Sequence, residues 1–275
     1  MMQYTVRGHD LSQVTSVVDL AEKISQQGIS SVQLALGMSF KDMPSEASHL
    51  NPGMGRMIAK ALAQKNIDVA ILSCYINMIH PDLDLREKLL QKFESYVKHA
   101  PYFGATMVAS ETGNIFPEII FTEDNFKDET FEKLVPVIER LVKAGEKHRV
   151  IIGIEPGLNH PLYSLERVEE LLERVDSDYL GIILDPTNLI TVETYQKQVE
   201  LVQEAFERFG DKIVAIHLKD FVIENQKIVP IDMGRGMIHY SEILDIIEKY
   251  KPHSYVVLEE TKDDFIGSAL KMLRN

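Results

Sequence analysis

Eight short apolar runs, rich in valine and isoleucine, alternate with eight longer amphipathic segments along the sequence. Short runs of this composition are typical of buried strands, and the longer segments have the apolar spacing of helices. The predicted strands are 3–6, 31–36, 69–74, 106–110, 150–155, 180–185, 213–218 and 255–260. The predicted helices are 12–27, 54–65, 84–103, 129–148, 164–175, 194–209, 240–250 and 263–273.

This strict alternation predicts parallel strands, because a parallel pair needs a crossover connection and the crossover is usually a helix. Closing eight such strands on themselves gives the predicted fold class, an α/β (β/α)₈ TIM barrel. An open doubly wound sheet is the alternative. No Gly/Ser or Pro linker divides the chain, so we expect a single domain over 1–275. Pro136 inside 129–148 should either kink that helix or mark its true start.

Composition narrows the classes of partner. The formal net charge is −13, with acidic residues spread along the chain, whereas nucleic-acid binders carry basic patches. No window approaches the roughly 18 apolar residues of a membrane span, and the first residues lack the pattern of a secretory signal. The single cysteine, Cys74, suits a reducing compartment. We therefore expect a cytoplasmic protein that binds neither nucleic acid nor membranes.

The last four predicted strands each have one aliphatic face and one face that ends in a polar residue. Alternate side chains of a barrel strand point at the helices and at the barrel axis. The aliphatic face should contact the helices, which leaves the polar face inside the barrel. The residues predicted to face the helices are Ile152, Ile154, Leu180, Ile182, Leu184, Val214, Ile216, Leu218, Val256 and Leu258. The inward-facing layer is Gly153, Ile183, Ala215 and Val257, and the polar residues above it are Glu155, Asp185, His217 and Glu259.

These four polar residues should meet at the C-terminal rim, where barrel enzymes have their active sites. Three carboxylates held close together repel one another unless positive charge lies among them. One solution is a ligand-free ion-pair cluster with His217 and Lys219. The other is a divalent cation, and three oxygen ligands with one imidazole suit Mn²⁺, Mg²⁺ or Co²⁺ better than Zn²⁺, which remains possible. Mn²⁺ is the predicted cofactor.

The segments IGIE, ILDPTN, IHLKD and VVLEE carry these residues. Together they resemble the xylose isomerase-like TIM-barrel superfamily, and within it the sugar phosphate isomerase/epimerase group. That group includes D-tagatose 3-epimerase, hydroxypyruvate isomerase and inosose dehydratase. The resemblance implies that Glu155, Asp185, His217 and Glu259 bind one divalent metal, usually manganese. It also implies that Glu155 and Glu259 are the catalytic proton-transfer pair and that the substrate is a small carbohydrate.

The implied chemistry begins with loss of a proton from the carbon beside a metal-bound carbonyl, which leaves an enediolate. Returning a proton from the opposite face gives an epimer, and returning it to the neighbouring carbon gives an aldose. We therefore predict a divalent-metal-dependent isomerase or epimerase of a sugar, sugar phosphate or related keto compound. The alternative on the same site is a dehydratase (lyase) of a keto-inositol-type substrate.

Two more distant alternatives belong to other classes. Endonuclease IV shares the superfamily fold, and the chain resembles it in Glu155 and Asp185. However, Asn188 stands where its zinc site has a histidine, and the histidines that end its strands three and four have no match here. DNA repair is therefore disfavoured. A non-catalytic, metal-dependent binding module is the other alternative, and a homo-oligomer is possible.

Further polar residues near the strand ends are candidates for substrate contact. Lys219 shares the inward parity of His217, and its alternative is a surface lysine paired with Asp220. For the histidines predicted to lie on loops, the alternative to substrate contact is a solvated position. The remaining predicted substrate-binding residues are Asn188, which can hydrogen-bond a hydroxyl, and His9, His80 and His160.

Overall fold

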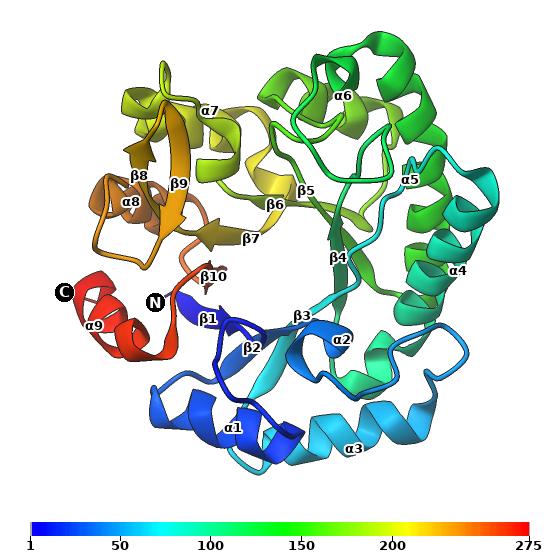
Figure 1. Ribbon diagram of the computed structural model, residues 1–275, viewed down its shortest axis with the longest axis vertical. Coiled ribbons are helices and arrows are strands. Elements are labelled where there is room, and N and C mark those ends of the chain that lie inside the picture. Colours follow the sequence, from blue (N-terminus) through cyan, green and yellow to red (C-terminus); the bar gives the residue numbers. More distant parts are fainter. Residues whose placement is uncertain (1, 275) are drawn as a thin grey trace.

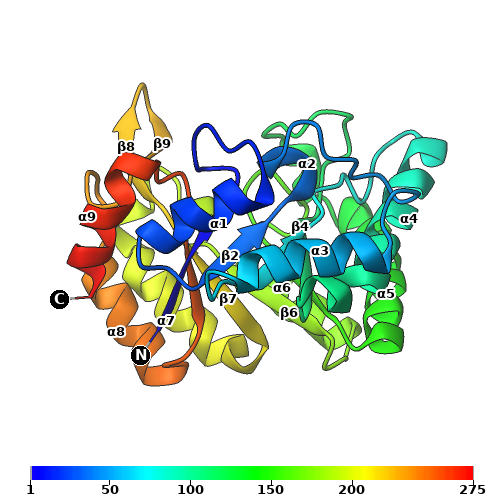
Figure 2. The ribbon, with the colours of Figure 1, turned by 90° about the horizontal axis from the view of Figure 1, so that it is seen from below.

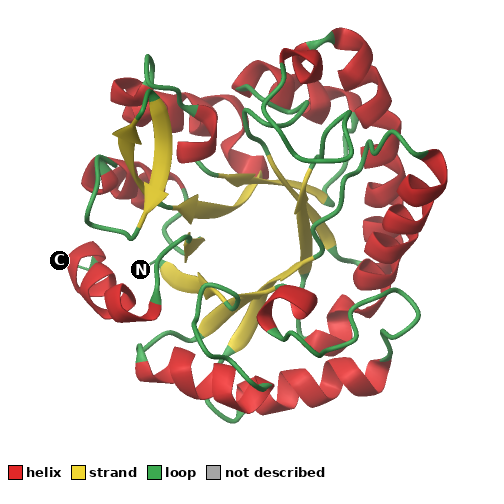
Figure 3. Cartoon of the chain, in the orientation of Figure 1, coloured by secondary structure: helices red, strands yellow, loops and turns green. Residues whose placement is uncertain are grey.

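A computed structural model describes residues 2–274, so the first and last residues of the predicted domain lie outside it. Eight parallel strands close into a barrel, and helices surround it (Figures 1 and 3). The predicted (β/α)₈ barrel is confirmed, and the open sheet is wrong. The strands are β1 (Gln3–Arg7), β2 (Ser31–Leu34), β3 (Asp68–Ser73), β4 (Met107–Glu111), β5 (Ile151–Glu155), β6 (Leu180–Leu184), β7 (Ile213–Leu218) and β10 (Tyr255–Leu258).

Each predicted helix is present, and none of the helices within 2–274 is both long and apolar enough to cross a membrane. Three helix ends lie at least four residues inside the predicted bounds. The first helix begins at Val17, because the Ser16 side chain caps it. The third predicted helix ends at His99, and a 3-10 turn containing Pro101 follows. The sixth predicted helix begins at Gln198, after a 3-10 turn at Tyr195–Lys197. The helices are α1 (Val17–Gln26), α3 (Pro52–Ala63), α4 (Leu83–His99), α5 (Asp128–His148), α6 (Leu165–Arg174), α7 (Gln198–Phe209), α8 (Tyr240–Tyr250) and α9 (Asp263–Leu273).

Pro136 lies in the interior of α5, so the helix does not start there. Its ring removes one backbone donor from the helix. Pro136 is exposed, whereas Leu134, Val135 and Ile138 are buried against the core. The proline therefore lies on the solvent-facing side of α5. The buried side of the helix is apolar both before and after Pro136.

One short helix and one two-stranded hairpin were not predicted. A short helix, α2 (Leu36–Ser39), begins where the second predicted strand was expected to end. An antiparallel hairpin, β8 (Asp220–Glu224) and β9 (Lys227–Ile231), follows β7 directly. Asn225 and Gln226 at its tip both have positive φ, as a two-residue hairpin turn requires. Figure 2 shows the hairpin projecting beyond the helices at one end of the barrel.

The core has two parts. A large cluster lies between the strands and the helices, and a small one fills the barrel with Ala70, Ile71, Met107, Ala109, Ile183, Ala215 and Val257. The inward and outward faces follow the predicted parity, with Val214 as the exception. Val214 packs against the inner cluster, because the β6–β7 register shifts at this level and places its side chain over Gly181.

Candidate metal centre and substrate cavity

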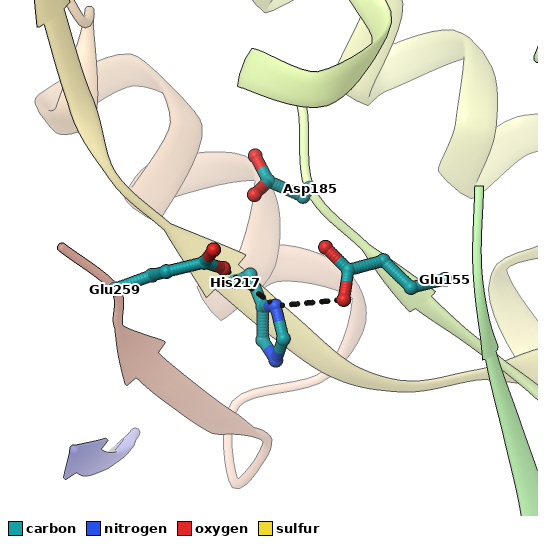
Figure 4. A group of neighbouring side chains, drawn as sticks. All are labelled: Glu155, Asp185, His217 and Glu259. Atoms are coloured by element: carbon teal, nitrogen blue, oxygen red, sulfur yellow. Dashed lines mark ion pairs between the residues drawn. The ribbon is translucent and has the colours of Figure 1, made fainter. Parts of the chain in front are cut away.

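The four predicted ligands converge at the C-terminal ends of neighbouring strands. Glu155 ends β5, His217 lies near the end of β7, and Asp185 and Glu259 directly follow β6 and β10. All four are buried, and each offers one ligand atom within 4.8 Å of the others. Figure 4 shows their side chains pointing toward a common centre, with Glu155 and Glu259 on opposite sides of His217.

Several polar atoms at this centre are poorly satisfied. Asp185 Oδ2, His217 Nδ1 and Glu259 Oε2 are buried and make no hydrogen bond within residues 2–274. They make ion-pair contacts instead, with His217 Nδ1 lying 2.8 Å from Glu259 Oε2 and 3.2 Å from Glu155 Oε2. Burying such atoms without hydrogen bonds is costly. Three oxygen donors and one imidazole nitrogen around a common point fit a divalent cation.

Gln33 in β2 determines which nitrogen of His217 faces the centre. The Gln33 amide nitrogen donates to Ser73 Oγ at 3.1 Å and to Tyr75 Oη at 3.0 Å. Its oxygen therefore faces His217 and accepts from Nε2 at 2.8 Å. A neutral His217 then has its unprotonated Nδ1 beside the carboxylates, which is the tautomer that a metal ligand needs.

Two buried cations border the carboxylates. Lys219 Nζ lies 2.9 Å from Asp185 Oδ2 and 3.1 Å from Glu259 Oε1, so its predicted alternative as a surface lysine paired with Asp220 is wrong. Arg7 Nη1 lies 2.7 Å from Glu259 Oε1. The contacts of Lys219 and His217 with these carboxylates form the ion-pair cluster that was predicted as the alternative to a bound cation.

The environment shifts the pKa of Asp185, His217 and Glu259. Burial raises the pKa of Asp185 to about 6, against the opposing charge of Lys219. Burial alone would lower the pKa of His217, but the carboxylates of Glu155 and Glu259 raise it to about 10. Burial would raise the pKa of Glu259, but Lys219, His217 and Arg7 hold it well below its usual range. The neighbouring cations therefore hold Glu259 as a carboxylate.

A cavity of about 720 Å³ adjoins this centre, because it is lined by Asn188 and Lys219, which contact the proposed ligands. It is bordered by the loops after β4, β5 and β6 and by the β8–β9 hairpin. Of the predicted substrate-binding residues, Asn188, Lys219 and His160 line it. The Asn188 amide nitrogen also donates to Glu155 Oε1 at 2.7 Å, so it links the cavity to a predicted catalytic residue.

His9 and His80 are placed differently from the other candidates. His9 is half-buried after β1, packed edge-on against Tyr75, and burial lowers the pKa of His9 to about 4. His80 is buried before α4, where its Nδ1 accepts from the backbone N–H of Asp82. Neither is among the residues that line the 720 Å³ cavity within the described chain. Their contact with a substrate stays a prediction.

Asp220 organises the loop that follows the hairpin. Its carboxylate is buried and accepts from the backbone N–H groups of Phe221, Gly234, Arg235, Gly236 and Ile238 at 2.7 to 3.0 Å. A Cβ at Gly236 would clash with Asp220 Oδ1 and the carbonyl oxygen of Phe221. Asp220 therefore has a structural role.

Three residues near the centre were not predicted: Arg7, Gln33 and Glu111. Glu111 could have been found by the parity rule, because Met107 and Ala109 precede it on the inward face of β4. Glu111 lines the cavity and is the partner of Glu155 in the β4–β5 register. Arg7 and Gln33 also have inward parity, because Val6 and Val32 beside them face the helices. Their partners, however, come from distant parts of the chain, so these contacts could not be predicted from the sequence.

Comparison with curated proteins finds distant relatives. The chain is 24% identical over 206 residues to an inosose dehydratase of Glaesserella parasuis, covering 66% of this chain and 67% of that protein. It is 26% identical over 160 residues to a D-psicose 3-epimerase of Enterocloster bolteae, covering 56% of this chain and 49% of that protein. The chain thus spans about half the length of the epimerase. Both named relatives are enzymes.

Comparison with solved structures supports the fold. The probable 3-DHS dehydratase AsbF of Bacillus anthracis superposes with a TM-score of 0.77 at 19% identity, covering 100% of this chain and 99% of that chain. At this identity the likeness concerns the fold alone. The family described as xylose isomerase-like TIM barrel matches residues 21–275, nearly the whole chain. The protein therefore belongs to the xylose isomerase-like TIM-barrel family.

Proposed function

We propose that this protein is a divalent-metal-dependent isomerase or epimerase of a sugar, sugar phosphate or related keto compound. The observation that carries the proposal is the convergence of Glu155, Asp185, His217 and Glu259, with ligand atoms within 4.8 Å of one another. Mn²⁺ is the cation that we expect, because oxygen donors predominate. The similarity to a D-psicose 3-epimerase supports this reaction class.

The bound cation would act as a Lewis acid that polarises the substrate carbonyl and stabilises negative charge on the oxygens. The proton transfers fall to Glu155 and Glu259. Because these carboxylates lie on opposite sides of His217 (Figure 4), one can remove a proton from a carbon held between them and the other can return one from the far side. Asn188 orients Glu155, and Arg7 and Lys219 orient Glu259.

A dehydratase is the second candidate, and the similarity to an inosose dehydratase favours it. The same proton abstraction would precede departure of a hydroxyl from the carbon next to the one that lost its proton. That hydroxyl would leave as water after gaining a proton. The two candidates share the proposed metal ligands and differ in the fate of the deprotonated substrate.

Solvent deuterium separates these possibilities. The Mn²⁺-loaded protein would be incubated in D₂O with ketohexoses, pentuloses, their phosphates and inosose. Deuterium on carbon in a product of unchanged formula indicates isomerisation or epimerisation, and loss of one water indicates dehydration. Bound metal without exchange or dehydration of any compound in the panel would instead indicate a binding module.

Metal analysis with matched variants tests the site itself. Glu155→Gln and Glu259→Gln should each lower metal content and reduce turnover at least 100-fold, because each removes a charged ligand and a proton carrier. Glu173→Gln on the exposed face of α6 is the matched control. Full metal content and turnover in both active-site variants would show that the cluster is only a set of internal ion pairs.

A further inference from the structure

Glu111 and His160 form a second polar pair in the cavity, apart from the four proposed metal ligands. Glu111 ends β4, and His160 lies on the loop after β5. Both line the cavity, and His160 Nε2 lies 3.6 Å from Glu111 Oε2. The His160 side chain is only 6% exposed, whereas that of Glu111 is 36% exposed. The pair thus presents a partly open carboxylate backed by a buried imidazole.

The surrounding loops hold this pair in place. His160 Nδ1 is 2.9 Å from the carbonyl oxygen of Gly113, so Nδ1 donates and Nε2 is directed toward Glu111. The carbonyl oxygen of the preceding residue, Asn159, accepts from the side chains of Asn114 and Asn125. Burial alone would lower the pKa of His160, but Glu111 and the Gly113 carbonyl raise it. The imidazole is therefore oriented before any ligand binds.

The position of the pair relates it to the proposed chemistry. Glu111 and Glu155 are register partners on adjacent strands, which are about 4.8 Å apart. A small sugar whose carbonyl lies near Glu155 would extend a more distant hydroxyl toward Glu111. A carboxylate accepts a hydrogen bond from a hydroxyl, and the Nε2–H of a protonated His160 can donate one to the same hydroxyl oxygen.

The rest of the cavity favours an uncharged ligand. Its charged residues nearly balance, with Lys219 and Lys227 against Glu111 and Glu193. Lys219 is already engaged by two carboxylates, and Lys227 is exposed on the hairpin. The described residues that line the cavity therefore form no preformed cluster of cations for a phosphate. The apolar part of the wall, suited to the C–H groups of a sugar, is formed by Phe121, Leu158, Ile190, Val192, Ile228 and Pro230.

We propose that Glu111 and His160 form a hydroxyl-binding subsite, which selects an uncharged polyhydroxylated keto compound over its phosphorylated counterpart. This inference rests on the proposed function and adds the substrate class to it. The pair binds a hydroxyl that is remote from the carbonyl carbon. It acts in substrate selection and leaves the abstraction of the carbon-bound proton to the two glutamates of the metal centre.

Two conservative variants test the subsite. Glu111→Gln keeps the shape of the side chain, and His160→Asn keeps an N–H for the Gly113 carbonyl but removes Nε2. The matched controls are Glu173→Gln and His49→Asn, both at exposed positions. The probes are D-psicose, inosose and psicose 6-phosphate, with calorimetric binding to the Mn²⁺-loaded protein measured beside turnover.

For the better unphosphorylated probe, we expect Kd and KM to rise at least 10-fold in both subsite variants, with kcat changed less than 3-fold. Metal content should equal that of the wild type. Wild-type protein should bind the phosphorylated probe at least 10-fold more weakly. Deoxy analogues of D-psicose that lack one hydroxyl, at C4, C5 or C6, identify the hydroxyl that the subsite contacts. The analogue without that hydroxyl should bind equally well to the variants and to the wild type.

The outcomes separate this inference from the proposed function. Unchanged Kd in both variants, equal or tighter binding of the phosphate, or loss of metal from either variant would overturn the subsite. So would a metal-loaded wild type that binds no unphosphorylated probe. Absence of metal and of deuterium exchange in the wild type would overturn the proposed function instead.

Discussion

His217 Nε2 lies 2.8 Å from Gln33 Oε1, so a residue on the second strand orients the imidazole presented by the seventh. The glutamine is itself held by Ser73 and Tyr75. This chain of hydrogen bonds leaves His217 Nδ1 facing Glu155 and Glu259. The orientation is built into the barrel and needs no ligand to produce it.

Replacing Gln33 by leucine should weaken metal binding by about 10- to 100-fold, the range typical for loss of a group that orients a ligand. The side chain is of similar size, so the barrel should stay folded. Isothermal titration with Mn²⁺ measures the effect, and Gln64→Leu on the surface is the control. Unchanged affinity in a folded Gln33→Leu protein would mean that His217 does not depend on this contact.

Arg7 should contribute to both the fold and the centre, because its guanidinium contacts Glu259, Asp10 and Glu260 in a largely buried position. Arg7→Met removes the cation that contacts Asp10 and Glu260 and one of the cations beside Glu259. Breaking a buried ion pair in this way costs about 3–5 kcal/mol of unfolding free energy. Urea denaturation measures the loss, and Arg56→Met at an exposed position is the control. A loss below 1 kcal/mol would contradict the prediction.

Asp220→Asn should destabilise the protein by on the order of 3 kcal/mol, because an amide has one acceptor oxygen where five backbone N–H groups converge. The amide nitrogen of the substituted side chain would also face backbone N–H groups, which are donors like itself. Chemical denaturation should show a lower midpoint with an unchanged slope. The same substitution at exposed Asp245 should change little, and equal midpoints for the two variants would refute this role.

His9 predicts a pH dependence of stability. Burial lowers the pKa of His9 to about 4, from an unfolded value of about 6.5. Between these values the unfolded chain binds a proton that the folded chain does not, so the contribution of His9 to stability falls as pH decreases from 6.5 to 4. The difference in unfolding free energy between wild type and His9→Asn should therefore change across this window and be flat above pH 7. A difference independent of pH would exclude a buried, neutral His9.

The barrel and the four proposed ligands could be predicted because both follow from short-range periodicity. Alternation of strand and helix determines the topology, and alternation of side chains within a strand determines which residues face inward. Val214 departs from the pattern because the β6–β7 register shifts there, and a register shift depends on two strands at once. No pattern within a single strand reports it.

The β8–β9 hairpin and the Gln33–His217 contact show the limits of local patterns. The hairpin turns at Asn225 and Gln226 without the Asn-Gly pair that usually marks such turns. Apolar residues on both sides, Val222 and Ile223 before it and Ile228 and Val229 after it, were the remaining signal. The contact between Gln33 and His217 joins residues 184 positions apart, so only the closed barrel brings them together.

The proposed metal centre and the cavity wall come from different parts of the chain, and this has an evolutionary consequence. The proposed metal ligands belong to strand ends, whereas much of the cavity wall comes from the β8–β9 hairpin and three loops. Insertions or exchanges in the hairpin can therefore diversify ligand preference while the reactive centre is inherited intact. For engineering, the tip at Asn225 and Gln226 is the place to graft sequence from other barrels, since its pairing is confined to its own two strands.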